Sequence, residues 1–492
     1  EGIVDHRLVV YRQHLLADAL RNRVQASTGS TSQDNSTHSS RILVTQAKSS
    51  FMCSFVFRLG RLSVMSSENP PIASNWTRET KSTRNVLIGI SALALGSYLL
   101  LAITSRSLSP HEYSMFAAFW SVVMGLILGA TAPLETFGLG TTSINEDKLQ
   151  IDRQFVDAIQ IVFVIALICI LLLVPWSVPR VFDGHWSFLI ATLFALVGFL
   201  FTYSARGILI VEHKSSRYAQ LMSLESLLRI LLAVLFIAVI GAGGSSVALA
   251  VSLAAIICGG LSYYSIRSHI DLNIRRNKLN IKNTGTFTPL LIASMATLLL
   301  LNLGPFVVQY LAGAEAAAAG VFLNALTLSR VPIMLGPVLQ ARLVPSVVAI
   351  LSREKFPTLG QLIGNGLRLL IIGGVVFVTL FSLVGNRVID VLFGGSTTLD
   401  HLDLALLALP TVLYLIAIAF QSVLVALKRT KLIAKAWTVG LGTYLIGLLI
   451  PFEAILKVEI AGVLAMTSVV TLLFYQLKQA MSIETVSNRM NS

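Results

Sequence analysis

Long apolar runs recur along the chain from residue 86 to residue 477, and polar or basic intervals separate them. A helix needs about twenty apolar residues to cross a hydrocarbon core about 30 Å thick. Twelve runs meet this requirement: 86–104, 115–134, 155–174, 187–211, 221–240, 246–266, 289–311, 317–348, 366–384, 404–427, 432–450 and 458–477. The pattern predicts an all-α, polytopic membrane protein with about twelve transmembrane helices, in which 317–348 forms either one long helix or a kinked pair.

A faint internal repeat divides these spans into two sets of six. Leu108 begins a short motif after the first span, and Leu311 begins a similar one after the seventh. Pro133 and Pro337 interrupt the second and the eighth spans at nearly the same offset. Parallel repeats related by an axis along the membrane normal give such a pattern. The expected parts are an N-terminal six-helix lobe at 85–266, a basic connector at 267–288, a C-terminal six-helix lobe at 289–478 and a cytoplasmic tail at 479–492.

The first 84 residues do not share this pattern, and we expect residues 1–84 to form a polar, disordered N-terminal segment. Residues 25–50 are rich in Ser, Thr, Gln and Asn and have no apolar period, which is typical of disorder. Met65 precedes a polar stretch that suits a start of translation, so we expect the natural chain to begin at or near Met65.

Basic residues are distributed unequally between the two sets of alternate loops. One set holds at most one basic residue per loop, such as Arg106 or Arg180, whereas the other holds clusters such as the one between Arg267 and Lys282. The positive-inside rule places the second set in the cytoplasm. Both termini fall on that side, so the sequence predicts a multi-pass protein of the cell membrane with cytoplasmic ends.

Composition and motifs exclude several classes of function. Charged residues make up 12% of the chain, about half the usual share of a soluble domain. The net charge of +13 follows from the loop asymmetry, so no nucleic-acid partner is expected. The sequence lacks a GxxxxGK[ST] phosphate loop, a zincin motif and a GxSxG elbow. We therefore expect no enzyme, no catalytic residue, no metal and no cofactor.

Arg330 is the most informative ionisable group within a predicted span. It lies about 16 Å from the outer end of the eighth span, close to the membrane midplane. A charge at that depth costs about 2.5–3.5 kcal/mol on insertion scales, so it should face a cavity or a partner. Pro332 and Pro337 follow and should bend the helix and free backbone carbonyl groups. We expect Arg330 to bind substrate and the two prolines to act in gating.

Other polar groups in the spans are weaker candidates. Glu225 and Arg229 lie one turn apart in the fifth span, at the spacing of an ion pair, and either stitch helices together or bind substrate. Asn324 is a further candidate cavity residue, although such amides more often join helices. Glu135 follows Pro133 and is a candidate gate at the inner mouth. Arg206, Arg368 and Asp157 are expected to extend to the cytoplasmic interface.

Several short motifs resemble one known family. The segment Arg106-Ser-Leu-Ser-Pro-His-Glu-Tyr-Ser-Met-Phe116 resembles the loop after the first span of Wzx-type polysaccharide flippases. These belong to the multidrug/oligosaccharidyl-lipid/polysaccharide exporter superfamily. The stretch from Pro305 to Pro345, with Leu-Ser-Arg330-Val-Pro332, is similar to their seventh and eighth helices. The resemblance covers roughly residues 85–480.

The resemblance implies two six-helix bundles around a central cavity that opens alternately to each side. The implied substrate is a polyprenyl-pyrophosphate-linked oligosaccharide, flipped from the cytoplasmic to the outer leaflet for surface polysaccharide biosynthesis. Implied partners are membrane lipids, a polysaccharide polymerase and glycosyltransferases. Midplane arginines suit this cargo, because a guanidinium group matches phosphate oxygens.

Three alternatives stay open from the sequence. A multidrug or cation antiporter of the same superfamily should carry acidic groups deep in the cavity, and a lipid II-type flippase often has two further helices. A membrane glycosyltransferase or polymerase is disfavoured, because the outer loops are too short for a catalytic domain.

Overall fold

The structure is a computed structural model. It describes residues 74–491 apart from 146–147, 152, 213, 242, 268–269, 272–286, 314–317, 352–355, 395–398 and 428. The expectations for residues 1–64, for a start at Met65 and for most of the basic connector therefore lie outside the described residues.

The N-terminal half is helical except for two short strands and part of a third. Its elements are α3 (Ser74–Ser107), α4 (Pro110–Val122), the π-helical turn η1 (Val123–Ile127), α5 (Leu128–Thr141), β1 (Thr142–Asn145), β2 (Lys148–Ile151), α6 (Arg153–Trp176), the π-helical turn η2 (Ser177–Val181), α7 (Ser187–Val211), α8 (Ser215–Val239), α9 (Gly244–Arg267) and β3 (Ile270–Asp271). The second span is thus one long helix with a π-bulge.

The elements described in the C-terminal half are all helices, joined by turns and short loops. Its elements are α10 (Phe287–Asn302), α11 (Gly304–Ala312), α12 (Ala318–Ser329), the 3₁₀ turn η4 (Val331–Met334), α13 (Leu335–Leu351), α14 (Phe356–Phe393), α15 (His401–Ala426), α16 (Thr430–Gly447) and α17 (Ala454–Asn491). The expected tail at 479–492 continues α17 as a helix through Asn491.

Most of the predicted spans are continuous helices. Nine described helices are long and apolar enough to cross a membrane, and the bent pair α10–α11 makes ten. The two other predicted spans are less regular. The run 317–348 forms α12, η4 and α13, so it is a broken pair, and α16 is an 18-residue helix that carries Lys431 and Lys435 near its start.

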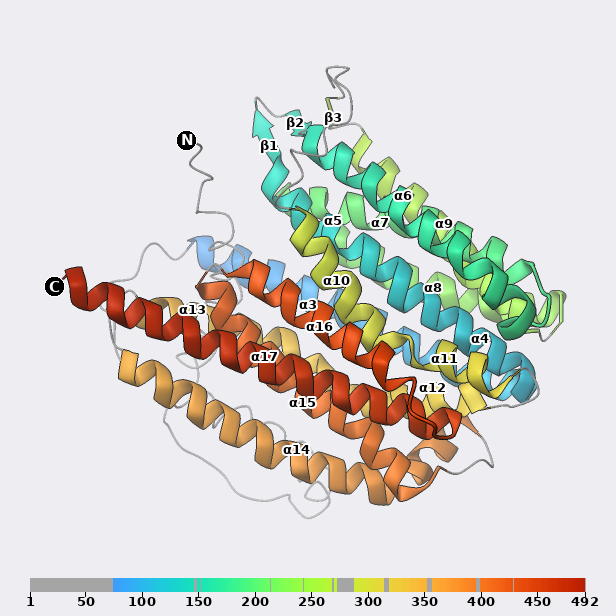
Figure 1. The fold of residues 1–492 in the computed structure, drawn as a ribbon. Helices are drawn as coiled ribbons and strands as arrows, with labels where there is room; N and C mark the ends of the chain where they lie inside the picture. Colours follow the sequence, from blue (N-terminus) through green and yellow to red (C-terminus); the bar gives the residue numbers. More distant parts are fainter. Residues whose placement is uncertain are drawn as a thin grey trace, which may run out of the picture.

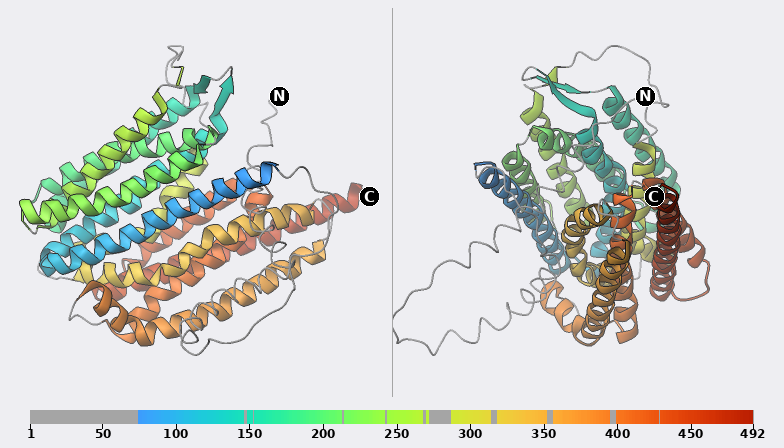
Figure 2. Two further views of the ribbon diagram at one scale, coloured as in Figure 1. Left: turned by 180° about the vertical axis from the view of Figure 1, so that it is seen from behind. Right: turned by 90° about the vertical axis from the view of Figure 1, so that its left-hand side faces the viewer.

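The helices form two groups, which we call the N lobe (α3–α9) and the C lobe (α10–α17) (Figure 1). Within the N lobe the most extensive packing joins α7 to α9 and α3 to α8; within the C lobe it joins α16 and α15 to α17. Figure 2 shows the same two groups from behind and from the side. The start of α3 and the end of α17 lie at the end that carries the strands.

Small residues bring the helices of the N lobe into close contact. A Cβ atom on Gly198 of α7 would lie 2.4 Å from the backbone carbon of Ala255 in α9, and one on Gly259 would lie 2.7 Å from the carbonyl oxygen of Gly198. Helices in a membrane gain no hydrophobic drive from one another, so close packing of small residues supplies much of their association. The crossing of α7 and α9 therefore depends on these two glycines.

Two local features depart from the sequence expectations. Strand β1 pairs antiparallel with β2, with Thr142 opposite Ile151, and β2 pairs parallel with β3, which adds a small sheet to a fold expected to be all-α. The first helix begins at Ser74, although residues up to 84 were expected to be disordered. Extending an existing helix adds one hydrogen bond per residue without a new nucleus, which explains the longer α3.

Candidate functional site

Three helix interruptions meet where the two lobes contact one another. They are the π-bulge η1 in the second span, the break between α10 and α11 in the seventh, and η4 in the eighth. Asn302, the last residue of α10, lies at the centre. Its carbonyl oxygen accepts a hydrogen bond from the hydroxyl of Ser121, and its amide donates to the carbonyl oxygen of Met124 at 3.4 Å. Interrupted helices of this kind form the substrate sites of many transporters.

The sequence of the seventh span accounts for its bend. Pro305 lies in the first turn of α11 and leaves Leu303 between the two helices, and α10 and α11 meet at 51°. The bend exposes polar backbone and side-chain groups of Asn302 toward the second and eighth spans. The sequence had placed a single helix at 289–311, because the apolar run is unbroken.

Arg330 lies at the break in the eighth span, as expected from Pro332. Helix α12 ends at Ser329, the 3₁₀ turn contains Pro332, and α13 contains Pro337 in its first turn. The half-buried guanidinium group of Arg330 donates to the side-chain oxygen of Asn302 at 2.9 Å. Its partner therefore comes from the seventh span, across the break.

Aromatic hydroxyl groups and a small cavity surround Arg330. Tyr98 of the N lobe and Tyr414 and Tyr444 of the C lobe are close enough to interact with it electrostatically. The cavity has a volume of about 50 Å³, and its polar lining comes from Arg330, Thr411, Tyr444 and Glu459. A cavity of this size with polar walls can hold water.

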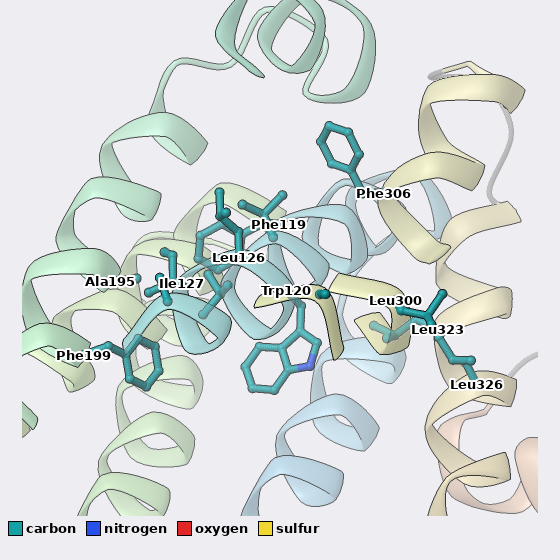
Figure 3. Close-up of a cluster of buried hydrophobic side chains, with 14 of the residues drawn as sticks. Phe119, Trp120, Leu126, Ile127, Ala195, Phe199, Leu300, Phe306, Leu323 and Leu326 are labelled. Atoms are coloured by element: carbon teal, nitrogen blue, oxygen red, sulfur yellow. The ribbon is translucent and has the colours of Figure 1, made fainter. Parts of the chain in front are cut away.

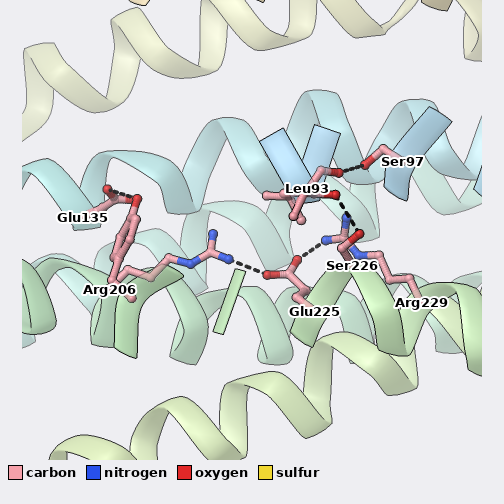
Figure 4. A network of polar contacts seen from close by, with 9 residues as sticks. Leu93, Ser97, Glu135, Arg206, Glu225, Ser226 and Arg229 are labelled. Atoms are coloured by element: carbon pink, nitrogen blue, oxygen red, sulfur yellow. Dashed lines mark hydrogen bonds and ion pairs between the residues drawn. The ribbon is translucent and has the colours of Figure 1, made fainter. Parts of the chain in front are cut away.

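A second group of charges is buried inside the N lobe, as Figure 4 shows. Glu225 of α8 forms ion pairs with Arg229, one turn further along, and with Arg206 of α7, at 2.6 Å. The three side chains are at most 4% exposed. The expected pair of Glu225 and Arg229 is thus present, and the triad of two arginines and one glutamate carries one surplus positive charge.

Arg206 does not extend to the cytoplasmic interface, contrary to the sequence expectation. It is fully buried, and its guanidinium group stacks on the ring of Tyr203 at 4.9 Å. Asp157 is likewise buried. The acidic partner of Arg206 lies on a different helix, so position along one span could not reveal it. Arg368 is exposed, and its extension to the interface stays a prediction.

One turn of α4 links the two arginine sites. The guanidinium carbon of Arg229 lies 5.9 Å from the ring centre of Trp120, and the next residue, Ser121, donates to Asn302, the partner of Arg330. Figure 3 shows Trp120 between Phe199 of α7 and Leu300 of α10. Arg229 and Arg330 therefore lie on opposite sides of the interface between the two lobes at Trp120 and Ser121.

The two remaining candidates lie apart from the contact of Ser121 with Asn302. The hydroxyl of Tyr218 donates to Glu135 at 2.9 Å, so Glu135 joins α5 to α8 near the end that carries the strands. Asn324 accepts a hydrogen bond from the hydroxyl of Tyr113 across the lobes. Their roles in gating and in binding stay predictions, as do those of Arg330, Arg229, Glu225, Pro332 and Pro337.

The contact of Tyr113 with Asn324 is one of several that join the lobes at the end opposite the strands. The topology predicted from the sequence places this end outside the cell, so we call it the outer end. The hydroxyl of Ser114 accepts from the backbone amide of Gly320 at 3.0 Å, and Arg180 donates to the hydroxyl of Tyr310 at 3.1 Å. Helix α12 packs on α4, whereas the main partners of α13 are α15 and α14. The second and eighth spans are thus joined in their outer halves and diverge toward the other end.

Sequence analysis missed Glu459 in α17. Its side chain is 2% exposed and lines the cavity beside Arg330. The carboxyl group faces that of Asp403 in the first turn of α15, and it has no other hydrogen-bonding partner among the described side chains. The available signal was a carboxyl group five residues after the start of an apolar helix.

Comparisons with known proteins agree on the fold. No protein-family model matches the sequence, and no curated protein matches it. A multidrug and toxic-compound (MATE) transporter of Vibrio cholerae, solved as the D35N mutant of VcmN, is similar in structure: the TM-score is 0.52 and the identity 15%, over 82% of this chain and 97% of that one.

Two further solved transporters show the same likeness. A MATE protein in complex with MaL6 has a TM-score of 0.52 at 16% identity, over 83% of this chain and 97% of its own. A multidrug resistance MATE family transporter of the MOP superfamily, in an outward-facing conformation, has a TM-score of 0.50 at 17% identity, over 82% and 95%. The chain is therefore a multi-pass membrane protein with the fold of the MATE transporters of that superfamily, and its similarity to them lies in the fold and not in the sequence.

Proposed function

We propose that the protein is an alternating-access transporter that moves an organic solute across the cell membrane. The observation that carries this proposal is the convergence of three interrupted spans on Asn302 at the contact of two helical lobes. Spans joined at one end and divergent at the other suit a state closed on one side of the membrane.

Antiport of a multidrug type is the better supported of the two cargo classes. The solved transporters of similar fold include a multidrug resistance protein. The sequence argument against antiport was that the deep unpaired charge is an arginine. Glu459 removes that argument, since a buried carboxyl group lines the cavity of the C lobe.

Flipping of a lipid-linked oligosaccharide is the second candidate, and one observation favours it. The described charges next to the lobe contact include Arg330 and the surplus positive charge of the Arg206–Glu225–Arg229 triad. A pyrophosphate that crosses the bilayer needs cationic partners, because its desolvation in hydrocarbon is prohibitive. The polymerase and glycosyltransferase partners belong to this candidate alone.

One pair of measurements separates the candidates. Proteoliposomes that hold the full chain are tested for efflux of ethidium, an organic cation, and for translocation of a fluorescent polyprenyl-pyrophosphate disaccharide. Antiport predicts efflux of the dye only, and flipping predicts movement of the lipid only. Failure of both assays with a folded protein would reject the proposed function.

Arg330 supplies a matched test within each assay. Replacing Arg330 with Lys keeps a charge and loses the planar contact, whereas Arg330→Ala removes both. If the cargo is a pyrophosphate lipid, we expect translocation to fall at least tenfold in the alanine variant and less in the lysine variant. Dye efflux that persists in both variants would assign Arg330 to the structure of the break and not to the cargo.

A further inference from the structure

The carboxyl groups of Glu459 and Asp403 form a pair at the outer end of the C lobe. Glu459 is the sixth residue of α17, about 8 Å along its axis from the start of the helix. Asp403 lies in the first turn of α15 and is half-buried. The backbone amide of Asp400 donates to one oxygen of Asp403 at 3.1 Å, as part of a capping box. Asp403 is thus held in place at the helix end, next to Glu459.

The surroundings of Glu459 offer it little positive charge. The elements packed against α17 are α16, α15 and α11. They present the buried hydroxyl of Tyr444, the carboxyl of Asp403 and the buried amide of Gln309; none of these is cationic. Glu453, just before α17, is exposed, and Lys457 in the first turn of α17 is half-buried. Arg330 lines the same cavity, where it donates a hydrogen bond to Asn302.

We propose that Glu459 and Asp403 together hold one exchangeable proton, and that this pair is the coupling site of the transporter. Two adjacent carboxyl groups in a poorly solvated place cannot both be ionised without a large electrostatic penalty. A shared proton removes one of the two charges and supplies the hydrogen bond that the buried Glu459 otherwise lacks.

A proton suits the site better than a metal cation does. A sodium or calcium ion requires about six oxygen ligands, and the cavity lining contributes only Thr411, Tyr444 and Glu459 besides the guanidinium group of Arg330. A positively charged neighbour also repels a metal ion. Proton uptake converts a carboxylate and a hydronium ion into a carboxylic acid and water, and Asp403 provides the half-exposed entry from the outer side.

The cavity connects this proton to the break in the eighth span. When the pair is protonated, Arg330 lacks a full negative partner in the cavity and keeps its contact with Asn302. When the proton leaves, Glu459 becomes an anion in the cavity that Arg330 also lines. The charge of the pair therefore favours one or the other arrangement of Arg330, at the residue where α12 gives way to η4.

The test is infrared difference spectroscopy of the full chain in lipid vesicles, titrated with acid and base. We expect the C=O stretching band of a protonated carboxyl group near neutral pH. The Glu459→Gln variant should lose this band, and the Glu453→Gln variant, which changes an exposed carboxyl just before the same helix, should keep it. The Asp403→Asn variant should still show a protonated-carboxyl band. The proton concentration at which this band disappears should differ at least tenfold from that of the wild type.

Three outcomes would overturn the proposal: no protonated band in the wild type, a band that survives Glu459→Gln, or loss of the band when sodium chloride is added at constant pH. The inference rests on the proposed transport function, but the measurement needs no transported solute. Dye efflux without a protonated-carboxyl band would refute the proton site and leave the transport proposal intact. A protonated-carboxyl band without any transport would support the proton site and refute the transport proposal.

Discussion

Replacing Glu225 with Gln should destabilise the protein more than any other single change in the buried triad. Glu225 forms ion pairs with both Arg206 and Arg229, and its side chain is 1% exposed. Removing one partner of a buried ion pair typically costs about 3–5 kcal/mol, because the other charge is left uncompensated. In this triad two guanidinium groups lose their ion pair with Glu225 at once, while Glu135 stays an electrostatic partner of Arg206, so we expect a loss within that range.

Removing a positive charge from the triad should lower the stability less than removing Glu225 does. Replacing Arg206 with Met leaves Glu225 paired with Arg229, which is a neutral pair, and fills a similar volume with an apolar chain. The loss then consists mainly of the stacking on Tyr203, about 2 kcal/mol for a desolvated cation on a ring. Glu135, which also interacts with Arg206, keeps its hydrogen bond from Tyr218.

The assay is the free energy of unfolding of each variant, measured by titration with a denaturing detergent in mixed micelles. We expect Glu225→Gln to lose at least about 3 kcal/mol and Arg206→Met to lose less than that. A Glu225→Gln variant whose free energy of unfolding lies within about 1 kcal/mol of the wild-type value would refute the reasoning that the triad carries a surplus positive charge. A larger loss of stability in Arg206→Met than in Glu225→Gln would refute it as well.

Two further predictions concern helix packing and the outer end. Gly198→Ala places a Cβ atom 2.4 Å from the backbone of Ala255, so we expect the free energy of unfolding to fall by about 1–3 kcal/mol through overpacking. The control Gly260→Ala, where no atom lies within 4 Å of the added Cβ, should change stability little. Equal effects of the two substitutions would show that α7 and α9 are not in close contact. Cysteines that replace Tyr113 and Asn324 in a cysteine-free background should form a disulfide on oxidation. We expect this disulfide to stop transport and its reduction to restore transport. Transport that continues with the disulfide fully formed would show that this contact does not open during the cycle.

Some features of the functional site were accessible from the sequence because they depend on local chemistry. Pro332 predicted the break at Arg330, since a proline removes a backbone donor whatever lies around it. The spacing of Glu225 and Arg229 predicted their ion pair, since residues four apart share a helix face.

Other features arise only from contacts between helices far apart in the chain. Arg206 was assigned to the interface because it lies near the end of its own span, whereas its partner comes from α8. Glu459 was overlooked because it lies only a few residues inside α17, while its burial depends on the packing of α15, α16 and α11. The bend after Asn302 was hidden within an unbroken apolar run.

The sequence alone therefore determined that the chain crosses the membrane many times, since the length and apolarity of each span must match the bilayer. The division into two halves by an internal repeat stays a prediction. Only the tertiary structure decided which buried charges meet: Arg206 with Glu225, Arg330 with Asn302, and Glu459 with Asp403. The physical reason is that a charge in hydrocarbon requires a partner, but any helix that the fold brings close can supply it.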